Sequence, residues 1–149
     1  MSEQRFIGCD PGADGAIALL TNAGEVACCI RFKKRTEHDI ANALREAIQD
    51  CKPVAMLERV NAMPKQGVAS TFKFGASYGF LRGILVGLQV PFHEVTPVKW
   101  QNFLNCRTRG QKAITKAAAQ RRWPAEKITH GNADALLIAE YCRQHFGDF

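Results

Sequence analysis

The chain has 149 residues, a length that suits one domain and leaves little room for two. Its apolar content of 46% and charged content of 23% are those of an ordinary globular domain and exclude wholesale disorder. Lysine and arginine outnumber aspartate and glutamate by 20 to 14, and the resulting charge of +6 favours a polyanionic partner without identifying one. We therefore expect a single domain over residues 1–149.

We expect no signal peptide, because the first four residues are polar and a strand-like run follows directly. The longest apolar stretch, residues 72–92, contains Lys73 and Arg82 and does not predict a membrane span. Six cysteines without C-x-x-C spacing lie mostly in apolar runs, which indicates reduced thiols in a core rather than zinc ligands. We expect a cytoplasmic protein of a bacterium, or of a virus that infects one.

The chain opens with three runs of strand type, at residues 5–9, 16–20 and 26–32. The first run stops at Asp10-Pro11-Gly12, and a short turn with Asn and Gly joins the second to the third. These patterns predict three antiparallel strands.

A helix and a fourth strand come next. Thr36 and Asp39 form a variant capping box, and apolar residues at helical spacing continue to about Asp50. Pro53 closes the linker, and residues 54–57 form an apolar strand that ends at Glu58. A strand–helix–strand crossover makes this strand parallel to the first.

The second half begins with a long predicted helix at residues 70–88. Glycines recur on it at every fourth residue, from Gly75 through Gly79 and Gly83 to Gly87. Each costs about 1 kcal/mol relative to alanine inside a helix. The spacing therefore indicates close approach of another backbone, either the sheet or a second copy of this helix.

A fifth strand is predicted at residues 90–95, followed by a short helix from Thr96-Pro97 and helices at 111–122 and 132–145. The order β-β-β-α-β-α-β-α predicts an α/β fold. Its mixed five-stranded sheet has three antiparallel strands plus two parallel ones, with helices on both faces. This order matches the ribonuclease H-like (RNase H-like) fold, in which the first strand is central.

Three acids fall at the ends of elements that this topology brings together: Asp10, Glu58 and Asp134. Neighbouring strands lie about 4.8 Å apart, so the first two carboxylates would repel each other unless a cation bridged them. Mg²⁺ suits such oxygen ligands, and His130 is a plausible fourth ligand.

Each acid also has a purely structural interpretation. The role of Asp10 could be limited to shaping a turn, which is the role we expect for Asp14. Glu58 could form an ion pair with the adjacent Arg59. Asp134 near a helix start interacts favourably with the helix dipole in any case. The coincidence of all three at one predicted edge favours a metal site.

Positive charge is concentrated between residues 99 and 127, which carry eight basic residues and one acid, while the rest of the chain sums to −1. A solvated helix would normally mix both signs, so we favour a surface that follows a phosphate backbone over a merely solvated face. No recognition-helix motif is present, which favours recognition of shape over sequence.

The motifs of the chain resemble those of the RuvC-type Holliday-junction resolvases, and more closely their phage-encoded and chloroplast relatives. The matching segments are Ile7-Gly8-Cys9-Asp10-Pro11-Gly12, Leu57-Glu58, Ala133-Asp134-Ala135-Leu136, and the helix segment with Gly67, Phe72-Lys73-Phe74-Gly75 and Tyr78-Gly79. The likeness extends over nearly the whole chain, in order.

The resemblance implies a homodimeric, metal-dependent endonuclease that resolves four-way DNA junctions by paired phosphodiester hydrolysis, with Mg²⁺ and also Mn²⁺ supporting activity. It implies that Asp10, Glu58 and Asp134 bind metal and that Lys99 and Lys112 are the two active-site lysines. The residues expected to contact DNA are Lys65, Lys73, Arg107, Arg109, Lys116, Arg121 and Arg122. The dimer contact is expected at Gly75, Gly79 and Gly83.

Two positions depart from the family pattern. A further aspartate often stands three residues before the last acid, where this chain has Gly131, and His130 is the expected substitute. Bacterial members place an aromatic wedge where this chain has Asn61, so Met63 or Phe72 would have to supply one.

Two other functions fit the same residues. An RNA-processing nuclease of RNase H-like type would be monomeric and would cut RNA instead of branched DNA. A non-catalytic junction-binding module would bind junctions without cleaving them in any metal.

Overall fold

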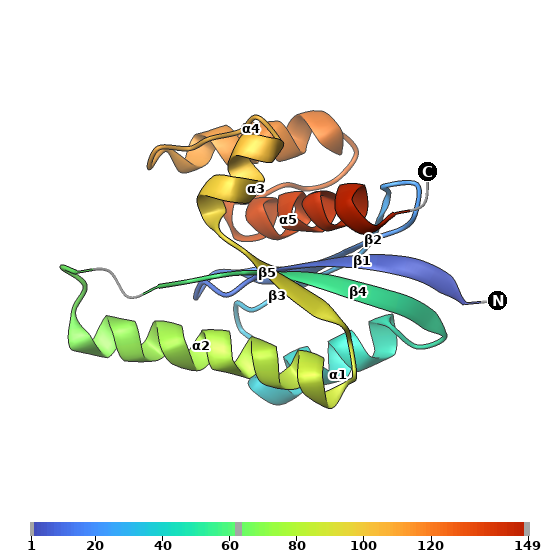
Figure 1. Ribbon diagram of the computed structural model, residues 1–149, viewed down its shortest axis with the longest axis horizontal. Coiled ribbons are helices and arrows are strands. Elements are labelled where there is room, and N and C mark those ends of the chain that lie inside the picture. The colour runs from blue at the N-terminus through green and yellow to red at the C-terminus, as the bar shows by residue number, and fades with distance from the viewer. Residues whose placement is uncertain (1, 62–63, 148–149) are drawn as a thin grey trace.

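The computed structural model describes residues 2–61 and 64–147 and contains a five-stranded sheet with helices on both faces (Figure 1). The strands are β1 (Glu3–Asp10), β2 (Ala16–Leu20), β3 (Val26–Arg31), β4 (Cys51–Glu58) and β5 (Phe92–Val95). The helices are α1 (Glu37–Ala47), α2 (Val68–Gly87), α3 (Pro97–Phe103), α4 (Lys112–Arg122) and α5 (His130–Phe146).

The sheet has the mixed topology that the sequence predicts. Its strand order is β3-β2-β1-β4-β5, with β1 in the centre. The first three strands are antiparallel, and β4 and β5 run parallel to β1. Cys9 lies opposite Leu57 in the β1–β4 ladder, so the two strands bring Asp10 and Glu58 to the same edge of the sheet.

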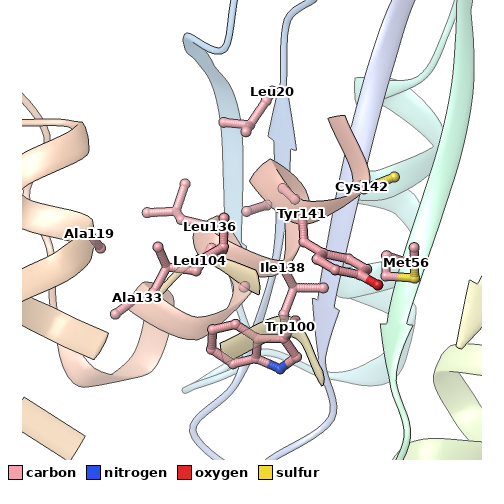
Figure 2. Packing of buried hydrophobic residues seen from close by; sticks show 14 of the residues in the cluster. Leu20, Met56, Trp100, Leu104, Ala119, Ala133, Leu136, Ile138, Tyr141 and Cys142 are labelled. Atoms are coloured by element: carbon pink, nitrogen blue, oxygen red, sulfur yellow. The ribbon is translucent and has the colours of Figure 1, made fainter. Parts of the chain in front are cut away.

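Side-chain alternation along the strands divides the core into two layers. Phe6 of β1 and Met56 of β4 pack with α5, α3 and α4 on one face (Figure 2). Ile7 and Leu57, one position further along, pack with α1 and α2 on the other face. Asp10 and Glu58 follow Phe6 and Met56 at even spacing, and therefore point to the α5 face.

Gly8 allows α5 to lie directly against the central strand. A Cβ atom at this position would stand 2.2 Å from the carbonyl oxygen of Ala135 and 2.3 Å from the amide nitrogen of Ala139. Both contacts are with backbone atoms that cannot rotate away, so any side chain would push α5 off β1. This close approach sets the position of Asp134 at the start of the helix.

The glycines of α2 have a different environment. Within the described residues, a Cβ atom at Gly75, Gly79, Gly83 or Gly87 would find no neighbouring atom within 4 Å. The interpretation that these glycines pack against the protein's own sheet is therefore wrong, because Leu81 and Leu85 on the opposite side of α2 make that contact. The glycine side is exposed.

Several element boundaries differ from the prediction for physical reasons. Pro53 lies inside β4, because β5 joins that strand only from Ala55 onward and the missing N–H of proline breaks no ladder bond there.

The predicted capping box of α1 is confirmed, with Asp39 N–H donating to Thr36 Oγ1 at 3.1 Å. All six cysteines are free; Cys28, Cys29 and Cys51 are only half-buried.

No helix in the described part of the chain combines the length and the apolar character needed to cross a bilayer.

Candidate active site

The three acids singled out in the sequence line one cavity of about 440 Å³ at the carboxyl ends of β1 and β4. Asp10 comes from the end of β1, Glu58 from the end of β4 and Asp134 from the first turns of α5. The loop that follows β1, the start of α4 and Phe74 of α2 complete the walls. Elements far apart in the sequence thus bring their carboxylates to one place.

The loop after β1 is shaped by short-range hydrogen bonds. Asp10 Oδ1 accepts a hydrogen bond from the Gly12 N–H at 3.1 Å, and Gly15 N–H donates to the Gly12 carbonyl at 2.9 Å. A Cβ atom at Gly15 would stand 2.1 Å from the Asp10 carbonyl oxygen, which explains why the chain has glycine there. Asp14, expected only to shape the turn, also lines the cavity.

A capping box that the sequence prediction missed places Asp134 and His130. Thr129 is the N-cap of α5: its N–H donates to Asn132 Oδ1 at 2.8 Å, and its side chain caps the first turn. The helix consequently begins at His130, two residues before its predicted start. Asp134 and His130 then lie one turn apart, and both line the cavity.

Burial raises the pKa values of the three acids, and the charge of a neighbouring acid adds to the shift of Asp10 and of Glu58. Desolvation, then the charge of Asp134, raise the pKa of Asp10 to about 6, although the Gly12 N–H and Lys112 oppose the shift. Desolvation, then the charge of Asp10, raise the pKa of Glu58 to about 8. Burial also raises the pKa of Asp134, against the effects of Thr115, Lys112 and His130. The carboxylates are therefore electrostatically coupled.

Trp100 holds Glu58 in place. The indole Nε1–H of this fully buried side chain donates to Glu58 Oε2 at 2.8 Å. Trp100 belongs to α3, directly after β5, and its ring packs in the core beneath α5 (Figure 2). The sequence prediction missed this residue, because a tryptophan in an apolar stripe is usually explained by packing alone.

The two lysines suggested by the family resemblance occupy different environments. Lys112 is the first residue of α4 and lines the cavity, where its charge lowers the pKa of both Asp10 and Asp134. Lys99 is exposed on α3 and is not among the residues that line the cavity. The geometry thus brings only Lys112 next to the acids.

The donor set is suitable for a hard divalent cation. Within residues 2–61 and 64–147, no three Asp, Glu, His or Cys side chains are gathered tightly enough to form a ready-made metal centre. The three carboxylates nevertheless share one cavity, and the pKa values of Asp10 and Glu58 are raised partly by the charge of a neighbouring acid. A cation with oxygen preference, such as Mg²⁺, would remove that repulsion, so the residues fit a metal.

The expected DNA-binding residues lie in the α3–α4 loop, on α4 and in and before the first half of α2, and none of them is among the residues that line the cavity. Arg107 and Arg109 are exposed in the loop between α3 and α4, and Arg121 is exposed at the end of α4. Arg122 is partly engaged, since its guanidinium lies 3.7 Å from the buried Glu140. Lys65 precedes α2, Lys73 lies in the second turn of α2, and Lys116 lies in the second turn of α4.

The exposed face of α2 is unusually apolar. Val68, Phe72 and Val86 share the glycine side of the helix and are 88%, 78% and 64% exposed. Phe72, one of the two residues considered as a junction wedge, is therefore accessible. Met63, the other, lies outside the described residues.

Comparison with solved structures places this architecture in a known fold. RuvC of Thermus thermophilus in complex with a Holliday junction substrate superposes with a TM-score of 0.62 at 14% sequence identity, over 93% of this chain and 90% of that chain. A second RuvC structure from Thermus thermophilus superposes with a TM-score of 0.57 at 15% identity, over 89% of each chain. No protein-family model and no curated protein sequence matches the chain.

The chain therefore has the RuvC-like form of the RNase H-like fold, as its element order predicts. At this level of identity the likeness establishes the fold, and the function has to be argued from the site itself.

Proposed function

We propose that this protein is a metal-dependent endonuclease that resolves four-way DNA junctions, and that residues 1–149 form one nuclease domain of the phage and chloroplast branch. The observation that carries the proposal is the cavity in which Asp10, Glu58 and Asp134 meet beside Lys112. The fold shared with RuvC, one structure of which holds a Holliday junction substrate, supports the choice of DNA.

The carboxylates would hold Mg²⁺, or Mn²⁺ in its place, with His130 as a further ligand. When bound, such ions activate water for in-line attack on a phosphodiester and stabilise the leaving 3′ oxygen. Lys112 lies where it can stabilise the negative charge that develops on the phosphate, and Trp100 fixes the orientation of Glu58. Lys99 would contact the DNA backbone beside the cleaved phosphodiester.

Paired incision requires two active sites on opposed strands, and therefore a dimer. The exposed side of α2, with Gly75, Gly79 and Gly83 between exposed apolar residues, supports a second copy as the partner. Small residues allow two helix backbones to approach closely, and burial of Val68 and Val86 would provide apolar area. Phe72 is our candidate for the wedge and would then have to stay uncovered in the dimer.

The test is cleavage of a substrate panel by the purified protein, in Mg²⁺ and in Mn²⁺. We expect paired nicks in a four-way junction, with linear duplex DNA and RNA left intact. Cleavage of RNA by a monomer would support the RNA-processing alternative instead. Junction binding without cleavage in either metal would support the non-catalytic module.

Asp10→Asn is the matched control for that panel. The substitution removes the central charged ligand while Asn Oδ1 can still accept the Gly12 hydrogen bond, so the loop should keep its shape. We expect cleavage to be abolished and junction affinity to be unchanged or slightly higher, because one carboxylate no longer repels phosphate. A variant that cuts at the wild-type rate would show that the active site lies elsewhere.

A further inference from the structure

A second basic cluster lies at the connection between β3 and α1. Four of its five residues are cationic: Arg31, Lys33, Lys34 and Arg35, with Phe32 between them. We call these five residues the 31–35 segment. It lies outside the basic stretch at residues 99–127.

The 31–35 segment is hydrogen-bonded directly to the loop that follows β1. Phe32 N–H donates to the Gly15 carbonyl at 3.1 Å. The Arg31 guanidinium lies against the start of α5, since a Cβ atom on Gly131 would stand 2.7 Å from Arg31 Nη2 and 2.8 Å from the Asp14 carbonyl oxygen. Arg31 thus lies close to the start of α5, the helix that carries Asp134.

The charges of the 31–35 segment are available for a ligand. Within residues 2–61 and 64–147, none of its four cations forms an ion pair with an acid. Arg31 Nε is buried and has no hydrogen-bond partner among those residues. The nearby Asp39 is already engaged, because its carboxylate accepts the Thr36 N–H in the cap of α1.

A groove of about 450 Å³ connects this segment with the catalytic cavity. Gly12 and Ala13 line both hollows, so the two are adjacent across the loop after β1. Two cations, Arg35 and Lys73 of α2, line the groove together with one acid, Glu37. The side chains of Arg31, Lys33, Lys34 and Arg35 also surround a second hollow of about 410 Å³ beside the groove.

We propose that the 31–35 segment binds the phosphate backbone of the DNA strand that leaves the catalytic cavity toward the α1–α2 side of the sheet. This inference rests on the proposed function. The basic stretch at 99–127 approaches the cavity from the α4–α5 side (Figure 1), so the two surfaces contact different parts of the substrate. Cations without a base-reading motif indicate contacts to phosphate rather than to bases.

The test measures the salt dependence of junction binding by fluorescence anisotropy in EDTA, so that no cleavage interferes. The variant is Lys33→Ala/Lys34→Ala, at two exposed positions where folding should not suffer. The logarithm of the affinity falls with the logarithm of salt by about 0.9 for each phosphate neutralised. We expect the double variant to flatten that slope by about 1–2 units.

Arg45→Ala/Lys52→Ala is the matched control, because it removes the same charge from exposed positions near the opposite end of the sheet. Its slope should equal that of the wild type. An unchanged slope in Lys33→Ala/Lys34→Ala, or an equal loss in both double variants, would overturn the inference. Thermal melting of each variant confirms that it is folded.

The outcomes for this surface and for the proposed function are separable. A wild-type protein that binds junctions but does not cut them contradicts the proposed function, while the slopes still decide the role of the 31–35 segment. A wild-type protein that binds no DNA contradicts both. Amine-reactive labelling gives an independent measure: junction DNA should protect Lys33 and Lys34 and leave Lys52 reactive.

Discussion

The hydrogen bond between Trp100 and Glu58 connects the core to the chemistry at the scale of single residues. Trp100→Phe keeps most of the ring but removes the N–H, leaving a buried carboxylate oxygen without its partner. We expect a stability loss of about 1–3 kcal/mol. Because Glu58 then loses its fixed orientation, cleavage at saturating DNA should slow by about tenfold, or about 1.4 kcal/mol.

Trp123→Phe is the matched control for that variant. The Trp123 indole N–H donates to the Gly24 carbonyl at 2.9 Å, and this comparably buried side chain does not line the cavity that contains Glu58. This variant should lose similar stability in a denaturant titration and keep the wild-type cleavage rate. Equal rate losses in both variants would show that Trp100 acts only through packing.

The raised pKa values of Asp10 and Glu58 make stability depend on pH. Their ordinary values of 3.8 and 4.5 apply to the unfolded chain, whereas the folded values are about 6 and 8. At a pH between the unfolded and folded pKa values of each group, the folded state binds more protons than the unfolded state. The stability contributed by these two groups is therefore fully present below about pH 4 and is lost as pH rises through 6 and 8.

Glu58→Gln isolates this effect, because a neutral amide can still accept the Trp100 hydrogen bond. Relative to wild type, the free energy of unfolding of the variant should rise little at pH 5 and by on the order of 4 kcal/mol at pH 8.5, measured by thermal denaturation in EDTA. Mg²⁺ should reduce the difference in stability between the variant and the wild type at pH 8.5, because it stabilises the wild type. A gap that does not change with pH would contradict the electrostatic coupling of the site.

At the scale of elements, α2 is the helix whose surface the fold leaves uncovered. In Gly79→Leu the new side chain meets open space in the monomer, and leucine favours a helix over glycine by about 1 kcal/mol. We expect the monomer to be at least as stable as wild type but unable to form the proposed dimer. Sedimentation analysis beside a melting curve measures both properties.

Gly79→Ala provides the graded comparison, since one methyl group adds far less bulk at the same position. It should retain more association than the leucine variant. If Gly79→Leu sediments as a stable dimer, the second copy binds elsewhere and the glycines have no role in assembly.

Element types and their pairing could be predicted from the sequence, because apolar periodicity and the crossover rule are local signals. Asp10 and Glu58 were predicted to meet because parallel strands end at one edge. The Thr129 cap was missed, and with it the first turn of α5, since asparagine replaces the usual Glu or Gln of the capping box. The environment of the α2 glycines could not be predicted, because glycine at every fourth residue indicates close packing without identifying the surface that packs there.

At the scale of the whole molecule, charge distribution should govern binding. Residues 99–127 carry a net +7 while the rest of the chain sums to −1. Changing the exposed Arg107 and Arg109 together to alanine should lower the salt slope of junction binding by about 1–2 units. The measurement is the same salt titration, and a slope equal to that of wild type would place the main DNA surface outside the α3–α4 loop.

The uneven distribution of charge along the chain could be predicted from the sequence, but its position relative to the site could not. The 31–35 segment contributes four cations that a count over the chain hides among nearby acids. Only the three-dimensional path of β3, which ends beside the loop after β1, brings those cations next to the cavity lined by Asp10 and Asp134. Trp100 was missed for a similar reason, since its partner lies 42 residues away in sequence.

The contrast between Gly8 and the α2 glycines has a consequence for how the protein tolerates mutation. In a pooled library of all single substitutions, cellular abundance reports folding and junction cleavage reports function. Substitutions at Gly8 should lower the cellular abundance of the protein, because the α5 backbone cannot move away from a side chain at this position. Substitutions at Gly75, Gly79 or Gly83 should leave abundance intact and remove only activity. Glycines of the two kinds would thus be retained under separate selective pressures, one for folding and one for assembly.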